Sequence, residues 1–202
     1  MGRIAGVTAA ETRERLLRAA ADVFARRGYD GTRVADIAAA AGVSNGALYA
    51  HFGSKAGLLV AALGAHGRRL MDGLFADDPD RPVADLLVAA GRRLPRPLDA
   101  GGDLVVEALA AARRDEDVAL PMRDYVGERA HRLAGLVRAG QDGGELDDAL
   151  SPEAIAHFCL LLAMGSALIA PDPHQVDEEE WARLLIRVVA ALSPAPPHEG
   201  TP

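Results

Sequence analysis

Helix start and stop signals recur at short intervals over the first 55 residues, and they constrain the fold more than any other feature. Thr8 and Glu11 form a capping-box pattern, and an apolar stripe with helical spacing follows as far as Gly28. The next N-caps are predicted at Thr32, Ser44 and Ser54. Short helices joined by turns of a few residues must pack on one another to be stable. The pattern therefore predicts a compact three-helix domain over residues 1–55, with a first helix at about 9–27.

The rest of the chain predicts more helices and no strand. Ala, Leu, Arg and Glu are abundant, and runs of β-branched residues are rare. Helices are predicted from Ser54 to about Phe75 and over about residues 83–94, 104–114, 118–140, 151–170 and 178–192. The predicted fold class is all-α with about nine helices. Residues 56–192 form a second helical domain, and the Pro-rich residues 193–202 predict a disordered tail.

Charge is unevenly distributed along the chain. The net charge is −7, which by itself argues against a nucleic-acid partner. Residues 1–55, however, carry eight Lys or Arg and five Asp or Glu, a net charge of +3. The other 147 residues carry 14 basic and 24 acidic side chains, a net charge of −10. A basic N-terminal part on an acidic body favours a localised surface for phosphates.

Several classes of protein are disfavoured. A single cysteine, Cys159, rules out an internal disulfide, and no signal peptide is visible. The longest apolar run, residues 158–170, has thirteen residues, so we expect no membrane span and a soluble cytoplasmic protein. No catalytic or phosphate-loop motif is present, and His157 and Cys159 are two apart on a helix, which disfavours a shared metal. We expect neither an enzyme nor a cofactor.

Residues 32–52 carry the strongest functional signal. Two helical segments are separated by a tight turn at Gly42, and Ala38 is small where the two helices would approach. Ile37, Val43 and Leu48 are the apolar residues that would hold the pair together. One face of the second segment then stays free, with Asn45, Gly46, Ala47, Tyr49 and His51. A helix presented in this way fits the major groove of DNA.

Candidate phosphate ligands flank this segment. Thr32 and Ser54 sit at helix N-termini, where free N–H groups and the helix dipole favour an anion. Lys55, the only lysine beside 21 arginines, follows at once, and Tyr49 has a hydroxyl to donate. The alternative is an ordinary helical hairpin, in which the serines are caps and Tyr49 and His51 are plain surface residues.

Five short strings in this region resemble the TetR (tetracycline-repressor-like) family. They are Gly28-Tyr29-Asp30-Gly31-Thr32, Ile37-Ala38-Ala39-Ala40-Ala41-Gly42-Val43-Ser44, Gly46-Ala47-Leu48-Tyr49-Ala50-His51-Phe52, Ser54-Lys55 and Leu58-Leu59. The resemblance covers about residues 8–63 and keeps both residue type and spacing. It implies a DNA-binding transcriptional regulator with phosphate contacts from Thr32, Ser44, Tyr49, His51 and Lys55, and base contacts from Asn45, Gly46 and Ala47. Arg33, beside Thr32, completes the expected DNA-binding set.

Two residues depart from the family's pattern. Asn45 stands where Lys or Arg is frequent, and Ala50 where an aromatic residue is common. Both changes reduce phosphate contact, so affinity would depend more on Lys55, Thr32 and an N-terminal arm with Arg3. Asn45 could instead read adenine, and DNA shape could supply specificity where Gly46 and Ala47 offer few hydrogen bonds. The alternative is a member that binds a small molecule or protein and has lost DNA binding.

The helix at 151–170 is apolar nearly all round from Phe158 onward, so it needs cover on more than one side. The resemblance implies that this helix and the last one form a four-helix interface in a homodimer, which then reads a pseudo-palindromic operator. The candidate interface residues are Leu161, Leu162, Ser166, Ile169, Trp181, Leu185, Val188 and Val189. The alternative is that both helices fill the core of a monomer.

The resemblance also implies that residues 56–192 bind a small effector, which would make the protein a repressor that its ligand releases from DNA. The candidate lining residues are His66, Leu70, Leu87, Val105, Leu109, Met122, Tyr125, Phe158 and Leu162. This mostly apolar set suggests an apolar or aromatic effector. The alternative is that these side chains are ordinary core residues.

Overall fold

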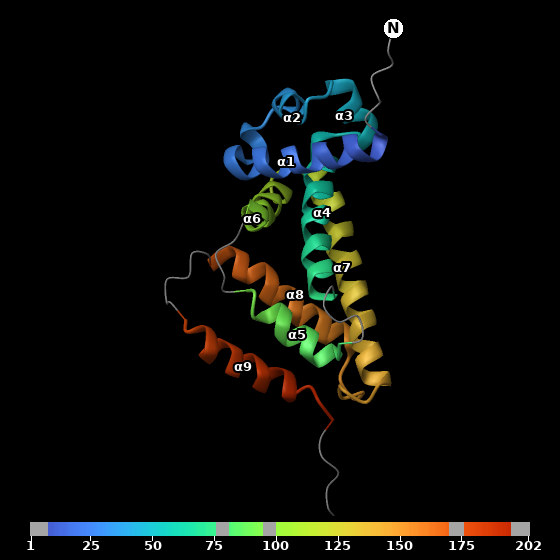
Figure 1. The fold of residues 1–202 in the computed structure, drawn as a ribbon, viewed down its shortest axis with the longest axis vertical. Helices are drawn as coiled ribbons and strands as arrows, with labels where there is room; N and C mark the ends of the chain where they lie inside the picture. The colour runs from blue at the N-terminus through green and yellow to red at the C-terminus, as the bar shows by residue number, and fades with distance from the viewer. Residues whose placement is uncertain (1–7, 76–80, 95–99, 170–175, 195–202) are drawn as a thin grey trace, which may run out of the picture. The chain divides into compact units, whose positions relative to one another are not determined.

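The computed structural model describes residues 8–75, 81–94, 100–169 and 176–194, and within these ranges the chain forms helices only. Figure 1 shows the helices in chain order. They are α1 (Ala9–Gly31), α2 (Val34–Ala41), α3 (Asn45–Phe52), α4 (Lys55–Phe75), α5 (Val83–Gly91), α6 (Ala100–Ala112), α7 (Glu116–Asp142), α8 (Pro152–Ile169) and α9 (Glu178–Ala190). The predicted all-α class and the predicted number of helices are confirmed for this part of the chain.

The chain divides into two compact units. The first contains residues 1–70 and 98–125, and the second contains residues 71–97 and 126–202. The division falls inside α4 and inside α7, so each of these helices contributes to both units. The first unit therefore contains α6 in addition to the three N-terminal helices. The boundary at residue 55 that the sequence suggested stays a prediction.

The core of the first unit is built on the buried stripe of α1. Leu16, Leu17 and Phe24 are almost fully buried, and α2 and α6 pack against the same helix. Figure 1 shows α2 and α6 on either side of α1. Leu58 and Leu59 of α4 are buried as well. Since each side chain covers the apolar surface of another helix, the short α2 and α3 are held by tertiary packing rather than by their own helical stability.

The second unit has a separate apolar core. Its buried centre consists of Leu146, Val137 of α7 and Ile155 of α8. Val83 and Cys159 pack against this centre. Burial raises the pKa of the Cys159 thiol, so this side chain behaves as a small apolar core residue. His157, two residues away, is exposed, as expected for two residues that point in different directions along a helix.

Helix α9 packs on α5 within the second unit. Its Trp181 donates the ring N–H to the carbonyl oxygen of Gly91 at 2.9 Å. A Cβ atom on Gly91 would lie only 2.9 Å from a methyl carbon of Leu185, so glycine permits this close approach. Figure 1 shows α9 running alongside α5.

Most of the predicted helix starts are confirmed. Thr8 and Glu11 form both hydrogen bonds of the capping box, and Ser44, Ser151 and Asp177 accept hydrogen bonds from the first turns of their helices. Thr32 is an exception, because α2 begins after Arg33 without any side-chain cap. The hydroxyl of Thr32 instead donates to the carbonyl oxygen of Gly28 at 2.6 Å, and this bond explains the error.

Helix α8 is longer than the apolar run that predicted it. The run has thirteen residues, but the helix begins at Pro152 and has eighteen, with a mean hydropathy of 1.6. By length and composition alone it is sufficient to cross a membrane, but one marginal helix of this kind does not indicate a membrane protein. This is weak evidence for a membrane segment, since apolar helices of soluble proteins meet the same criterion.

Three predictions concern parts of the chain outside the described residues. Arg3 and its N-terminal arm belong to residues 1–7, and the predicted tail falls mostly within residues 195–202. The side chain of Leu70 is likewise outside the described part of α4.

Candidate nucleic-acid interface

The turn between α2 and α3 is closed by backbone hydrogen bonds. Gly42 adopts the left-handed conformation, with φ 65° and ψ 40°, which L side chains rarely adopt. The N–H of Val43 donates to the carbonyl oxygen of Ala38 at 2.9 Å. Ser44 then starts α3, and its hydroxyl accepts a hydrogen bond from the N–H of Ala47 at 3.2 Å. The chain therefore turns sharply from α2 into α3, as the sequence predicted.

Two arginines of α1 hold this turn from outside. Arg15 donates from one guanidinium nitrogen to the carbonyl oxygens of Ala41 and Gly42, which lie at the end of α2. The guanidinium of Arg13 lies 5.4 Å from the centre of the Phe52 ring, at the end of α3. These contacts attach both helices to α1.

Helix α3 has one buried anchor and one open face. Leu48 is completely buried and is the one buried residue of the helix. Asn45, Gly46 and Tyr49 are exposed, and half of the Tyr49 surface is open to solvent. Ala47 and His51 are half-buried at the edge of this face. The residues predicted to meet DNA therefore lie on the outer side of α3, with Ala50 exposed among them.

The start of α2 presents Arg33 rather than Thr32. Thr32 is only 2% exposed, and its hydroxyl donates a hydrogen bond to the carbonyl oxygen of Gly28. Its side chain is therefore not available to a phosphate in this conformation, which corrects the contact that the resemblance implied. Arg33 is exposed and is the N-cap residue of α2, beside the N–H groups of the first helical turn.

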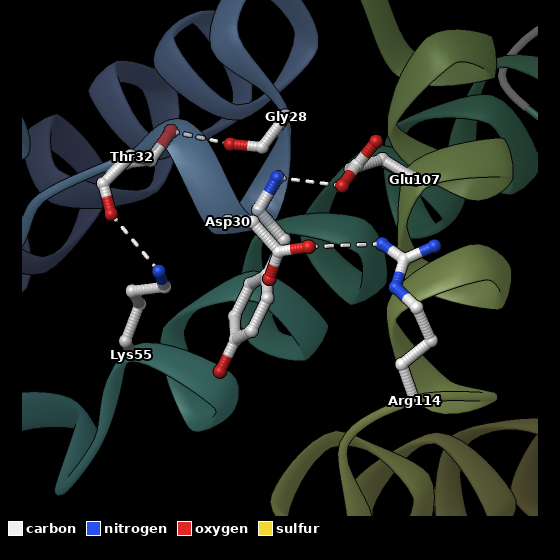
Figure 2. A network of polar contacts seen from close by, with 7 residues as sticks. Gly28, Asp30, Thr32, Lys55, Glu107 and Arg114 are labelled. Atoms are coloured by element: carbon white, nitrogen blue, oxygen red, sulfur yellow. Dashed lines mark hydrogen bonds and ion pairs between the residues drawn. The ribbon is translucent and has the colours of Figure 1, made fainter.

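Lys55 is partly engaged within the protein. Its ammonium donates to the carbonyl oxygen of Thr32 at 2.9 Å and lies 4.2 Å from the centre of the Tyr29 ring. Figure 2 shows Lys55 pointing toward the corner formed by residues 28–32. An ammonium has three donors, so it can still donate to a phosphate beside these interactions. Ser54, just before it, caps α4 by accepting from the N–H of Gly57 at 2.9 Å, as predicted.

The same corner is held from the other side by α6 and by Arg114, which lies just beyond the end of that helix. The carboxylate of Glu107 accepts a hydrogen bond from the N–H of Tyr29 at 2.6 Å, and Arg114 pairs with Asp30 at 3.1 Å (Figure 2). The backbone leaves the helical path at Gly28, with φ 70° and ψ 170°, and a Cβ atom there would lie 3.3 Å from the Glu107 carboxylate. The positive φ thus favours glycine at this position, and a Cβ atom would require the Glu107 carboxylate to move by a few tenths of an ångström.

The nine candidate effector residues do not fall in one unit. His66, Leu70, Val105, Leu109, Met122 and Tyr125 belong to the first, and Leu87, Phe158 and Leu162 belong to the second. Met122 is buried, and His66, Val105, Leu109, Tyr125 and Leu87 are half-buried. Phe158 is 45% exposed and Leu162 is 36% exposed. An effector site built from these residues stays a prediction.

The candidate interface residues separate into two groups. On α8, Leu161, Leu162 and Ile169 are exposed and Ser166 is half-buried. On α9, Leu185 and Val189 are buried, and Trp181 and Val188 are half-buried. Leu185 packs at Gly91 of α5, so this side chain already has cover in its own unit. The part that α9 plays in a dimer interface stays a prediction.

Three residues that shape the site were not found from the sequence. Arg15, Arg13 and Glu107 hold the helix pair and the corner at Gly28. Their partners are backbone groups or a ring, and they lie up to 78 positions away in the sequence. Charged residues on helix surfaces are frequent, so no local pattern distinguishes these three.

Comparison with known proteins places this geometry in a family. Residues 16–62, which contain α2 and α3, match the family model described as "Bacterial regulatory proteins, tetR family". The probable HTH-type transcriptional regulator ArpR of Pseudomonas putida is 32% identical over 93% of this chain and 95% of its own length. The HTH-type transcriptional repressor BepR of Brucella suis is 31% identical over 78% of this chain and 79% of its own length.

Solved structures agree with these sequence relatives. A TetR-family regulator from Rhodococcus sp. has a TM-score of 0.77 at 25% identity, and the match covers 92% of this chain and all of that one. Salmonella enterica GusR has a TM-score of 0.71 at 26% identity, over 90% of this chain and 95% of its own. With its helix pair matched and two relatives aligned over most of their length, the chain belongs to the tetR family of bacterial regulatory proteins, which are helix-turn-helix transcriptional regulators.

Proposed function

We propose that this protein binds duplex operator DNA as a homodimer and represses transcription until a small effector releases it. One observation carries the DNA-binding part. Helix α3 is anchored by the fully buried Leu48 and leaves Asn45, Gly46 and Tyr49 open to solvent beside the exposed Arg33. A short helix fixed from behind and open in front fits the major groove, and Arg33 at the start of α2 can contact the phosphate backbone.

The exposed face of α8 supports a dimer. Five large apolar side chains of this helix are exposed, namely Phe158, Leu161, Leu162, Leu168 and Ile169. Exposed apolar surface of this kind favours burial against another protein surface. Regulators of this family bind operator DNA as homodimers, so a second copy of α8 is the partner proposed here. Two copies would place two α3 helices on one DNA face, about 34–36 Å apart.

The family relationship supports the proposal that the protein represses transcription and that a ligand releases it from DNA. BepR, a relative over most of its length, is named a repressor, and regulators of this family respond to small molecules. We place the effector near the half-buried His66, Tyr125 and Leu109. Its binding would shift α4, which begins at Lys55, and would lower operator affinity by the difference in binding free energy between the two states. A regulatory role without catalysis and a cytoplasmic location complete the proposal.

Selection from a random-sequence duplex library tests DNA binding whatever the operator sequence is. We expect enrichment of sequences with two-fold symmetry, and enrichment of no duplex at low salt would contradict the proposal. With the selected duplex, Asn45→Ala should change base preference at one symmetric pair of positions, since a bidentate contact to a base discriminates by about 1–3 kcal/mol. Asp148→Ala, an exposed change in the second unit, is the control.

The proposed dimer has its own test. Leu161→Arg places a charge on the exposed face of α8, where Leu161 is 59% exposed. We expect a monomer on a sizing column and loss of operator binding. Leu120→Arg is the matched control, because Leu120 is 57% exposed but lies on α7 in the first unit. A normal dimer from Leu161→Arg would move the interface away from α8.

A further inference from the structure

A polar contact joins α6 to the corner between α1 and α2. One carboxylate oxygen of Glu107 accepts a hydrogen bond from the N–H of Tyr29 at 2.6 Å. Because the backbone leaves the helical path at Gly28, this N–H needs an acceptor other than the α1 ladder. Tyr29 is only 6% exposed, so water is a poor substitute for that acceptor.

From Tyr29 the contacts continue toward the candidate DNA-binding surface. The hydroxyl of Thr32 donates to Gly28 at 2.6 Å, and the N–H of Thr32 donates to the carbonyl oxygen of Tyr29 at 3.2 Å. Lys55 closes the chain of contacts, because it donates to the carbonyl oxygen of Thr32 and lies over the Tyr29 ring. Figure 2 shows Glu107 and Lys55 on opposite sides of this corner.

We propose that Glu107 is a positioning residue for DNA binding, which holds the Gly28–Thr32 corner so that Arg33 and Lys55 meet the phosphate backbone. The residue does not contact DNA itself. Its carboxylate thereby connects α6 to the Gly28–Thr32 corner, which precedes α2 and which Lys55 at the start of α4 also contacts. The inference rests on the proposed function, because it assigns the control of that same DNA-binding site.

Arg114, two residues beyond the end of α6, offers a contrast. It pairs with Asp30 of the same corner, but the two side chains are 57% and 73% exposed. Exposed ion pairs of this kind contribute little, because water and salt screen them. The hydrogen bond from Tyr29 is partly buried and has a charged acceptor, so it is the stronger of the two connections. Arg114→Ala is therefore a matched control for Glu107.

The test measures affinity for the duplex that the wild-type protein selects from a random-sequence library, at several salt concentrations. Glu107→Ala should weaken binding about tenfold, a factor typical of coupled sites. The slope of log affinity against log salt should fall by roughly 0.9 for each phosphate that a subunit no longer contacts. Glu107→Gln keeps an acceptor oxygen and should retain most of the affinity, and Arg114→Ala should leave it nearly unchanged.

The salt slope separates positioning from simple instability. A variant that only unfolds in part would lower the active fraction, which titration at stoichiometric concentrations measures, but would leave the slope unchanged. The effects of Glu107→Ala and Lys55→Ala should also be less than additive, because both act through one corner. Full additivity would overturn the inference.

Two further outcomes are decisive. Unchanged affinity and slope in Glu107→Ala, with wild-type binding intact, would overturn this inference alone. A wild-type protein that selects no duplex would overturn the proposed function and the inference with it. If Glu107→Ala does not fold, Glu107→Asp is tested in its place. The aspartate keeps the charge but is one methylene shorter, so its carboxylate is withdrawn from Tyr29. Glu107→Asp should then weaken operator binding as expected for Glu107→Ala, and unchanged affinity would overturn the inference.

Discussion

The ammonium of Lys55 lies 4.2 Å from the centre of the Tyr29 ring, so the first residue of α4 is bound to the end of α1. The same ammonium donates to the carbonyl oxygen of Thr32 at 2.9 Å. Lys55 therefore has a structural role in the absence of DNA. A contact with a phosphate would add a second role through its remaining donors.

Lys55→Ala separates these two roles. Loss of the cation–π contact and of the hydrogen bond should lower the free energy of unfolding by about 1–2 kcal/mol, measured by urea denaturation. If Lys55 also contacts phosphate, the salt slope of operator affinity should fall by roughly 0.9 per subunit. Arg132→Ala removes one positive charge from an exposed residue of the second unit and should change neither quantity much. A lower stability with an unchanged slope would leave Lys55 a purely structural residue.

Leu48 and Tyr49 are neighbours on α3, but substituting them should affect different properties: stability for Leu48 and operator binding for Tyr49. Leu48 is fully buried, and Leu48→Ala should lower the free energy of unfolding by about 2–5 kcal/mol. Tyr49 is half exposed, and Tyr49→Ala should cost less than about 1 kcal/mol of stability while weakening operator binding. Thermal unfolding and DNA titration on the same two proteins measure both effects. Equal loss of stability in the two variants would show that Tyr49 belongs to the core.

Gly42→Ala tests the turn between α2 and α3. At φ 65° an alanine is strained, and its Cβ atom would lie 2.6 Å from a guanidinium nitrogen of Arg15. We expect a loss of about 1–2 kcal/mol in unfolding free energy, since Arg15 can move aside but the backbone strain stays. Gly135→Ala is the matched control, because it lies within α7 and no atom comes within 4 Å of an added Cβ. That change should stabilise the helix by about 0.5–1 kcal/mol.

Tyr29 should make stability fall at high pH. Burial, followed by the nearby charge of Asp115, raises the pKa of its hydroxyl to about 12 in the folded protein. The unfolded chain loses this proton near the ordinary tyrosine pKa of about 10, so between these values the folded state binds more protons. Stability from this group is therefore complete below pH 10 and is lost as the pH rises toward 12.

The measurement is a series of denaturation curves at rising pH for the wild type and Tyr29→Phe. The phenylalanine variant should lose this part of the pH dependence. Tyr49→Phe, a change at an exposed tyrosine, should keep it. Identical pH dependence in the wild type and Tyr29→Phe would contradict the buried, neutral state assigned to Tyr29.

Local signals predicted the helices and the exposed face of α3 well. The capping pattern at Thr8, the cap at Ser44 and the turn at Gly42 act over three or four residues, and all three are present in the structure. The open face of α3 follows from the same local periodicity. At Thr32 the local pattern was not sufficient. Its hydroxyl had two possible uses, a cap for α2 or a bond to Gly28, and the kink at Gly28 decided in favour of the second.

Tertiary partners are the part that the sequence could not supply. The apolar stripe of α9 was expected to meet a second subunit, but Leu185 packs at Gly91 of its own unit. An amphipathic stripe shows that a helix must pack against another surface, but it does not identify that surface. Glu107 is a similar case. Its partner is the backbone N–H of Tyr29, 78 positions away, and no pattern of side chains in the sequence predicts this contact.

The exposed apolar side chains of α8 have a consequence for how strongly the gene would respond to the amount of this protein. In a single chain Leu161 and Ile169 are exposed. If two copies must join before either reads DNA, operator occupancy at low expression should rise with the square of the number of chains in the cell. A twofold change in synthesis would then change repression about fourfold, before any effector enters.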